Sequence, residues 1–218
     1  MRSPIRPGAA LIGGMILGIV FALVVWKLTP LSLGGPSPSP TSTMPAATQT
    51  TVYTVQATPL AASPGGSTLA TLTPATALQV LGAQGASLQA GLDLYRSLDS
   101  PTIVYQDPAT LVRAGVLASP SAAQPAGSVT VAGSPWQRVH LAGWVTRSAT
   151  APDLSALWSQ ASSLYAQSCG TCHTPHDPSE FTGRQWVSQF RAMVPRTSLT
   201  QGQADLILKW LQAHAAKQ

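Results

Sequence analysis

The sequence predicts an α+β multidomain protein with an N-terminal transmembrane helix, a β-rich domain and a C-terminal all-α domain. Three observations carry this prediction: one long apolar run, a series of short alternating runs separated by Gly and Pro, and three amphipathic helical patterns. They divide the 218 residues into a membrane anchor (1–27), a linker rich in Pro, Ser and Thr (28–50), a β-rich domain (51–150) and an all-α domain (151–218).

Residues 9–26 form an uninterrupted apolar stretch of 18 residues, with Arg2 and Arg6 before it and Lys27 after it. This length is just enough for a helix to cross a bilayer. A cleavable signal peptide is the alternative, but no small-x-small cleavage site follows promptly, which favours a retained signal anchor. In both interpretations the N-terminus stays in the cytoplasm and the rest of the chain lies on the extracytoplasmic, periplasmic side. We therefore expect a single-pass protein of the cell membrane.

The charge pattern excludes some partners. The net charge is +5, charged residues make up 9% of the chain, and no run of Lys or Arg is interleaved with aromatic residues. Nucleic-acid binding is therefore not expected.

The linker contains a Pro-Ser repeat that cannot form a helix, so we expect an extended, semi-rigid spacer above the membrane.

The β-rich domain shows short runs with alternating polarity, separated by turn residues. This pattern predicts a small β-barrel or a rolled sheet. The stretch between residues 81 and 128 is longer than a minimal barrel needs, so we expect an insertion or a helical turn around residues 88–98. The predicted strands lie at 51–55, 67–72, 77–81, 102–105, 129–131, 136–141 and 143–145.

The C-terminal domain begins with a helical pattern for which Asp153 is positioned as the N-cap. The second pattern begins near Thr182 and stops before Pro195. The third begins at Thr200, and Gln203 stands three residues later as the partner in a capping box. A domain this small has a limited core, so we expect a bound prosthetic group to supply apolar surface.

The run Cys169-Gly-Thr-Cys172-His173 contains both cysteines of the chain. This spacing is the attachment signature of a c-type haem, in which both thiols form thioether bonds and the adjacent imidazole binds iron. We predict one covalently bound haem c, with His173 as the proximal iron ligand. A disulfide or thiol redox pair and a zinc site are the alternatives. A helical pattern precedes the motif, Pro175 follows it, and no second pair of zinc ligands is present, so haem is favoured.

The second axial ligand has few candidates. Met193 falls at the end of the second predicted helix, before a Pro-containing loop that is able to bring a thioether onto the iron. The alternative for Met193 is core packing on a shared apolar stripe. His176 stands only three residues after the proximal ligand, His214 lies near the end of the last helix, and His140 lies in the β-rich domain. Met193 is therefore the predicted distal ligand.

Other residues near the motif carry weaker predictions. The guanidinium groups of Arg184, Arg191 and Arg196 match haem propionates in geometry, with a solvated helix face as the alternative. Tyr165 and Trp186 are expected to pack on the porphyrin rather than to carry chemistry.

Residues from 163 onward resemble the C-terminal mono-haem domain of membrane-anchored cytochromes c that serve periplasmic trimethylamine N-oxide reductases and related molybdoenzymes. The features that carry the resemblance are Leu164-Tyr165, the Cys-x-x-Cys-His motif, Phe181-Thr182, Gln185-Trp186, Ala192-Met193 and the closing Leu-rich helix. Residues 136–145 resemble both the segment before that domain and the closing hairpin of bacterial SH3-like domains. These resemblances imply a small SH3-like β-barrel followed by a cytochrome c-type haem domain, with His173 as the proximal and Met193 as the distal ligand.

One departure from that family is large. Its members carry a multi-haem module of repeated Cys-x-x-Cys-His motifs between the anchor and the C-terminal domain, whereas this chain has one motif and a Pro-rich spacer. Because the family assigns quinol oxidation to that module, we expect this chain to relay electrons from another membrane complex.

These observations predict an electron carrier rather than an enzyme, since no Ser/His/Asp grouping or paired acids stand out. The expected role is transfer of single electrons between a membrane respiratory donor and an extracytoplasmic redox partner, such as a molybdoenzyme reductase. One alternative is a haem-based sensor or cell-envelope binding protein that works through the SH3-like domain. Another is a fixed haem subunit of a larger membrane complex.

Overall fold

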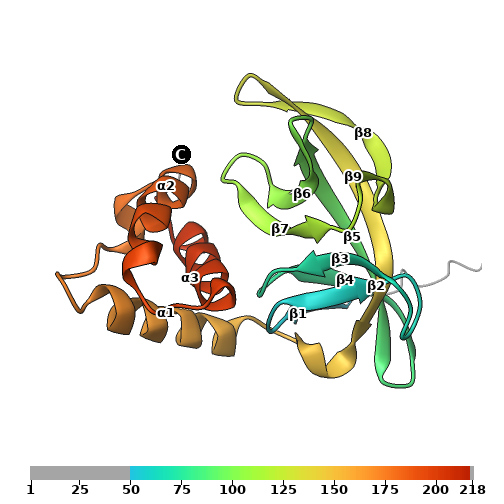
Figure 1. Cartoon of the computed structure of the whole chain (residues 1–218), viewed down its shortest axis with the longest axis horizontal. Coiled ribbons are helices and arrows are strands. Elements are labelled where there is room, and N and C mark those ends of the chain that lie inside the picture. Colours follow the sequence, from blue (N-terminus) through green and yellow to red (C-terminus); the bar gives the residue numbers. More distant parts are fainter. Residues whose placement is uncertain (1–49, 217–218) are drawn as a thin grey trace, which may run out of the picture. The chain divides into compact units, whose positions relative to one another are not determined.

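In the computed structural model, which describes residues 50–216, a large antiparallel β-sheet precedes three α-helices (Figure 1). This order confirms the β-rich and then all-α arrangement. The strands are β1 (Thr51–Thr54), β2 (Thr58–Ala61), β3 (Thr68–Leu72), β4 (Ala77–Gln84), β5 (Ser87–Ser97), β6 (Ser100–Asp107), β7 (Val112–Leu117), β8 (Gln124–Val131), β9 (Ser134–Thr146) and β10 (Thr150–Ala151). The helices are α1 (Ser155–Cys169), α2 (Gly183–Met193) and α3 (Gln201–Ala213).

The ten strands follow the order β10-β1-β4-β5-β6-β7-β3-β2-β9-β8, with a further pairing between β5 and β9. β5 pairs with β9 along its whole length, from Ser87 opposite Thr146 to Ser97 opposite Trp136. Its other edge pairs with β4 first and then with β6. The β5–β9 pairing therefore closes β5, β6, β7, β3, β2 and β9 into a ring, which leaves few exposed strand edges.

The alternation of side chains explains why β5 is a strand. Leu88, Ala90, Leu92 and Leu94 are at most 4% exposed and recur at every second residue. A period of two places all four side chains on the inner face, where they join the main hydrophobic core. The predicted insertion or helical turn at residues 88–98 is therefore wrong. The strands β2 and β7 also have no counterpart among the predicted strands.

Two of the three predicted helix starts are confirmed, with the predicted capping box at Thr200 and a further, unpredicted one at Thr182. The Thr182 hydroxyl accepts from the Gln185 backbone N–H, and the Gln185 side chain accepts from the Thr182 N–H at 2.9 Å. Thr200 and Gln203 repeat this arrangement at α3. The first helix differs by one position: Leu154 is its N-cap, and the Asp153 carboxylate accepts from the Ser155 N–H at 2.8 Å.

The helices share a core of their own and also pack against the strands. The helix core contains Tyr165, Trp186, Phe190, Ala204, Ile207 and Leu211. A smaller cluster joins Ala75 from the strand region to Leu157 and Ala161 of α1 and Leu206 of α3. The Lys209 Nζ donates to the Pro74 carbonyl oxygen at 2.7 Å. The strands and helices thus belong to one compact unit.

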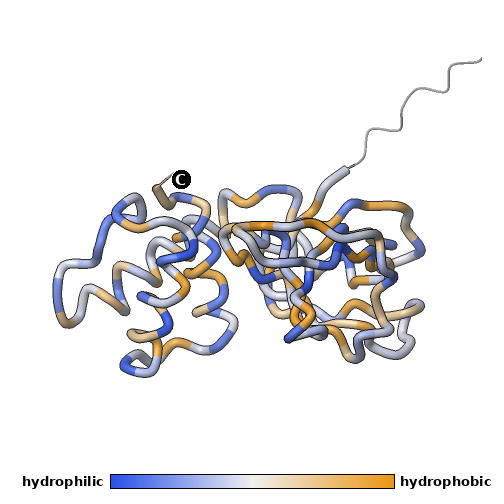
Figure 2. The backbone as a smooth tube through the Cα atoms, turned by 90° about the horizontal axis from the view of Figure 1, so that it is seen from above, coloured by the Kyte–Doolittle hydropathy of each residue, from blue (hydrophilic) through white to orange (hydrophobic). Residues whose placement is uncertain are grey.

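Figure 2 shows hydrophobic and hydrophilic residues interspersed along the strands and helices. Within residues 50–216, none of the helices is both long enough and apolar enough to cross a membrane. The predicted membrane anchor (1–27) and nearly all of the predicted linker (28–50) lie outside the described residues.

Candidate haem-binding site

The Cys-x-x-Cys-His motif lies where α1 ends. Cys169 is the last residue of the helix, and the Gly170 N–H donates to the Ala166 carbonyl oxygen at 3.0 Å. A Cβ on Gly170 would overlap that same oxygen, so a residue without a side chain fits this turn. Cys169 is half-buried, whereas Cys172 and His173 are exposed on the following loop.

The loop and α2 enclose one mostly apolar cavity. Cys169, Cys172, His173 and Met193, which come from segments about twenty residues apart, all line it. Met193 is 39% exposed and is one of the few large apolar side chains in the described residues with such exposure. The remaining lining residues are Tyr165, Ser168, His176, Trp186, Gln189, Phe190, Arg196 and Thr197. The structure thus brings all four predicted site residues to a single cavity.

The orientation of His173 leaves one ring nitrogen available. Its Nδ1 lies 2.8 Å from the Thr174 carbonyl oxygen. A carbonyl oxygen only accepts hydrogen bonds, so Nδ1 carries the proton and Nε2 holds the free lone pair. Metal-binding histidines are commonly held in this way, with the second nitrogen donating to a carbonyl group.

Tyr165 forms part of the inner wall of the cavity. It is 6% exposed, and its hydroxyl donates to the His176 carbonyl oxygen at 2.9 Å. Burial, together with the nearby Cys169 and Glu180, raises the pKa of Tyr165 to about 12, so the phenol stays neutral. Burial also raises the pKa of the Cys169 thiol. The inner wall therefore carries no negative charge at neutral pH.

The other histidines occupy different positions. His176 lines the cavity, lies edge-on to His173 with ring centroids 5.8 Å apart, and hydrogen-bonds Glu180 at 2.9 Å. His214 bonds the Trp210 carbonyl oxygen at the end of α3, and His140 lies on β9. Neither of these two lines the cavity. Among the histidines considered as a distal ligand, only His176 therefore shares the site.

The three arginines considered for propionate binding also lie at different places in the structure. Arg196 lines the cavity, as do the aromatic residues Tyr165 and Trp186. The Arg184 Nε instead donates to the Ala109 carbonyl oxygen at 3.3 Å. Arg191 lines a second cavity on another side of α2. Only Arg196 is placed to contact a group held beside the motif.

Sequence reasoning did not anticipate the second cavity or the buried Lys209 at its wall. The available signal was a single Lys within a helix that otherwise buries Ala204, Leu206, Ile207 and Leu211. A Lys on such a face is rarely fully buried unless polar groups receive it.

The donor set of the first cavity fits a c-type haem. Both cysteines are free thiols, His173 offers a nitrogen, and Met193 offers a thioether sulfur beside aromatic walls. A site for a bare metal ion fits less well. Within residues 50–216, no group of three or more His, Cys, Asp or Glu side chains is arranged to hold one.

Comparison with known proteins links the strand region to one family. Residues 46–150 match the family described as the TorC third cytochrome c domain. Both cysteines of the chain lie after this segment, so the match covers the β-rich part and not the motif. The segment before the motif is therefore similar to part of a cytochrome c-type protein.

The individual relatives are named as cytochrome c-type proteins. The chain is 28% identical over 81 residues to the cytochrome c-type protein TorC of Escherichia coli O157:H7, which covers 37% of this chain and 21% of that protein. It is 29% identical over 153 residues to the cytochrome c-type protein TorY of the same organism, which covers 67% of this chain and 41% of that protein. The chain thus spans less than half the length of these relatives. No solved structure matches the chain significantly, so the SH3-like topology stays a prediction.

Proposed function

We propose that this chain is a membrane-tethered mono-haem cytochrome c that transfers single electrons on the extracytoplasmic side of the membrane. The observation that carries the proposal is the single cavity lined by Cys169, Cys172, His173 and Met193. The similarity to TorC and TorY, whose names describe cytochrome c-type proteins, supports it independently.

The residues of the cavity have distinct tasks in this proposal. Cys169 and Cys172 would hold the haem by thioether bonds, and His173 would offer its Nε2 to the iron because its Nδ1 is engaged by Thr174. Met193, at the end of α2, would offer its thioether sulfur as the other iron ligand. When bound, the haem supplies the one-electron chemistry, and a methionine ligand raises its reduction potential relative to a histidine ligand.

The surroundings of the cavity suit an electron carrier. Trp186 and Phe190 are at most 4% exposed and form an apolar inner wall. Cys172, His173 and Met193 are exposed, so the opposite side of the cavity is near the surface. A group held there has one edge within reach of a redox partner, and such encounters are small and transient.

The partners follow from the anchor and from the relatives. The N-terminal apolar stretch would hold the protein at the membrane, where a respiratory complex acts as donor. The similarity to TorC and TorY makes a molybdoenzyme reductase, of the kind that reduces trimethylamine N-oxide, the proposed acceptor. Covalent haem attachment on the extracytoplasmic side agrees with this location.

The test is the replacement of Met193 in the full-length chain, made in a host that matures c-type cytochromes. The wild-type protein is expected to carry one covalent haem and a near-infrared methionine-to-iron band. Met193→Ala is expected to lose that band, and Met193→His to lower the reduction potential, because a histidine replaces a methionine on the iron. The control is Met44→Ala, which removes the methionine of the linker and should leave both readouts unchanged.

Two results would contradict the proposal. If the wild-type chain has only the mass of its amino acids and no Soret absorption, the haem assignment fails. If the wild-type haem protein lacks the methionine-to-iron band, or keeps it in Met193→Ala, Met193 is not the distal ligand. In the first case His176→Ala tests the remaining histidine of the cavity. Ready binding of carbon monoxide to the reduced wild-type protein would favour a haem-based sensor over an electron carrier.

A further inference from the structure

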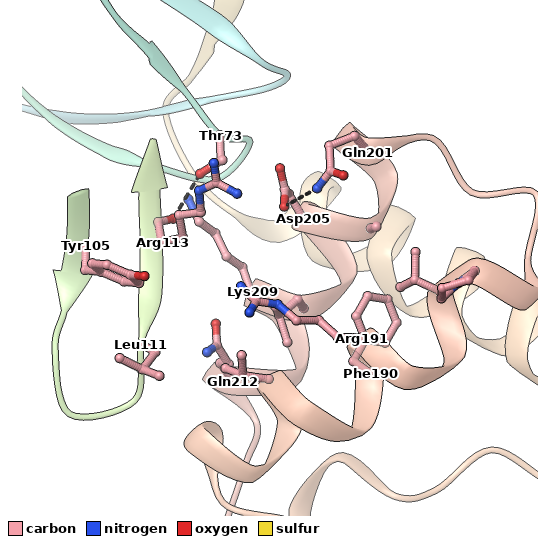
Figure 3. Close-up of a pocket in the computed structure, with 15 residues that line it drawn as sticks. Thr73, Tyr105, Leu111, Arg113, Phe190, Arg191, Gln201, Asp205, Lys209 and Gln212 are labelled. Atoms are coloured by element: carbon pink, nitrogen blue, oxygen red, sulfur yellow. Dashed lines mark hydrogen bonds between the residues drawn. The ribbon is translucent and has the colours of Figure 1, made fainter. Parts of the chain in front are cut away.

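A second cavity lies between the strands and the helices. β6 and β7 form one wall, and α2 and α3 form the other (Figure 3). The side chains that matter for its chemistry are Tyr105, Arg113, Arg191, Asp205, Lys209 and Gln212. α2 lies between this cavity and the haem-binding site: Gln189 and Met193 line the haem-binding cavity, Val187 and Arg191 line this one, and Phe190 lines both.

The charges around this second cavity are not balanced. The two guanidinium groups of Arg113 and Arg191 and the buried amine of Lys209 line it, against one acidic side chain, Asp205. Within residues 50–216, no carboxylate oxygen lies within 4.0 Å of a nitrogen of these three basic side chains. Lys209 is 5% exposed and uses its Nζ to donate to Pro74 and to the Thr76 hydroxyl. Positive charge in such a partly enclosed space favours an anion.

Two buried polar atoms in the wall have no partner. The Gln212 side chain is oriented by its Nε2, which donates to the Thr110 carbonyl oxygen at 2.7 Å and to the Gly183 carbonyl oxygen at 3.4 Å. This fixes Oε1 as the free acceptor, and within the described residues it receives no hydrogen bond although Gln212 is 8% exposed. The Arg113 Nε is a buried donor that is likewise unpaired. Leaving such groups unpaired is costly, so they indicate a ligand.

The directions of the side chains agree with this interpretation. Figure 3 shows the Tyr105 hydroxyl and the Arg191 guanidinium pointing toward one another, with the Gln212 amide directed into the same space. Arg191 is exposed and comes from α2, so it stands at the mouth, whereas Gln212 is buried at the wall. An occupant of this space would meet donors from Arg191 and Tyr105 and one unpaired acceptor from Gln212, whereas the Arg113 guanidinium lies beside Thr73 and Asp205.

We propose that this cavity binds a small oxyanion that also carries a hydroxyl or acidic OH group, such as hydrogen phosphate or a hydroxycarboxylate. The oxygen atoms accept from Arg191, for which a guanidinium is well suited, and from the Tyr105 hydroxyl. The OH group donates to the Gln212 Oε1. This site does not require haem, because none of its chemistry involves the Cys-x-x-Cys-His motif.

The experiment titrates inorganic phosphate into the full-length chain in detergent at pH 7, by isothermal titration calorimetry at constant ionic strength. We expect saturable binding of one phosphate per chain. Sulfate, which has no proton to donate at this pH, is expected to bind about tenfold more weakly or worse, because the Gln212 Oε1 then stays unpaired. Lactate against propionate repeats the comparison for carboxylates.

Variants identify the residues. Arg191→Met is expected to weaken phosphate binding about tenfold or more, because it removes a charge-assisted hydrogen bond. Arg191 is exposed, so its loss should leave the far-UV circular dichroism spectrum unchanged. Arg138→Met removes an exposed arginine from β9, away from the cavity walls, and is the matched control with wild-type affinity. Gln212→Met should remove the preference for phosphate over sulfate.

Three results would overturn the proposal. The first is the absence of saturable phosphate and lactate binding. The second is equal affinity for phosphate and sulfate in the wild-type chain. The third is equal weakening by Arg191→Met and Arg138→Met, which would show binding through net charge only. None of these results bears on haem attachment, so the two proposals fail separately.

Discussion

The strongest prediction about stability concerns the buried Lys209. Its side chain is 5% exposed, and burial lowers its pKa from 10.5 to about 7 in the folded protein. The nearby Asp205 raises this pKa, and Arg113 lowers it further. Between pH 7 and pH 10.5 the unfolded chain therefore binds more protons than the folded one. The free energy of unfolding should rise with pH across this window, by roughly 1.4 kcal/mol for each pH unit.

The perturbation is Lys209→Met, which keeps an unbranched apolar stem and removes the titrating amine. Urea denaturation of both proteins is followed by far-UV circular dichroism at pH 7.5 and 9.5, in detergent and in buffers without oxyanions. Other titrating groups cancel in the difference between the two proteins. The free energy of unfolding of the wild type, relative to that of Lys209→Met, should rise by about 2 to 3 kcal/mol between pH 7.5 and 9.5. A difference that does not change with pH would refute the reasoning, because Lys209 would then have an ordinary pKa.

Two further predictions test the backbone. Gly115→Ala in β7 places a Cβ against the Thr71 carbonyl oxygen and 3.0 Å from the Leu72 Cα of β3, so unfolding should become easier by about 2 to 4 kcal/mol in urea denaturation. The control is Gly202→Ala in α3, where a Cβ meets nothing within 4 Å, so stability should stay unchanged or rise by up to about 1 kcal/mol. Equal losses of stability in both variants would show that the close approach of β7 to β3 at Gly115 is not the cause. Thr182→Ala removes the N-cap of α2 and should cost about 1 kcal/mol by the same measurement, whereas an unchanged midpoint would show that the cap contributes nothing.

The sequence alone predicted those features that depend on residues close to one another along the chain. The helix starts near Thr182 and at Thr200, and the capping box of the second, were predicted because each depends on residues only a few positions apart. The spacing of Cys169, Cys172 and His173 likewise lies within five consecutive residues. Short-range patterns of this kind do not need knowledge of the tertiary fold.

Sequence reasoning failed for β5, although its alternation was present. Residues 88–98 were predicted to hold an insertion or a helical turn, because residues 81–128 are more than a minimal barrel needs. The structure uses this length to pair β5 with β9 throughout and with two other strands along its second edge. The ring closes through strand pairs that lie 39 to 59 residues apart, from Ser97 with Trp136 to Ser87 with Thr146, and no local pattern reveals them.

By itself, the sequence determined the attachment motif, the starts of the last two helices and the β-then-α order, because these follow from neighbours along the chain. Only the tertiary structure decided that Met193 shares a cavity with Cys169 and His173, and that Lys209 and Gln212 are buried against the strands. The physical reason is that a side chain's burial and partners depend on which faces of distant elements pack together. That packing is set by the whole core and not by the residues on either side.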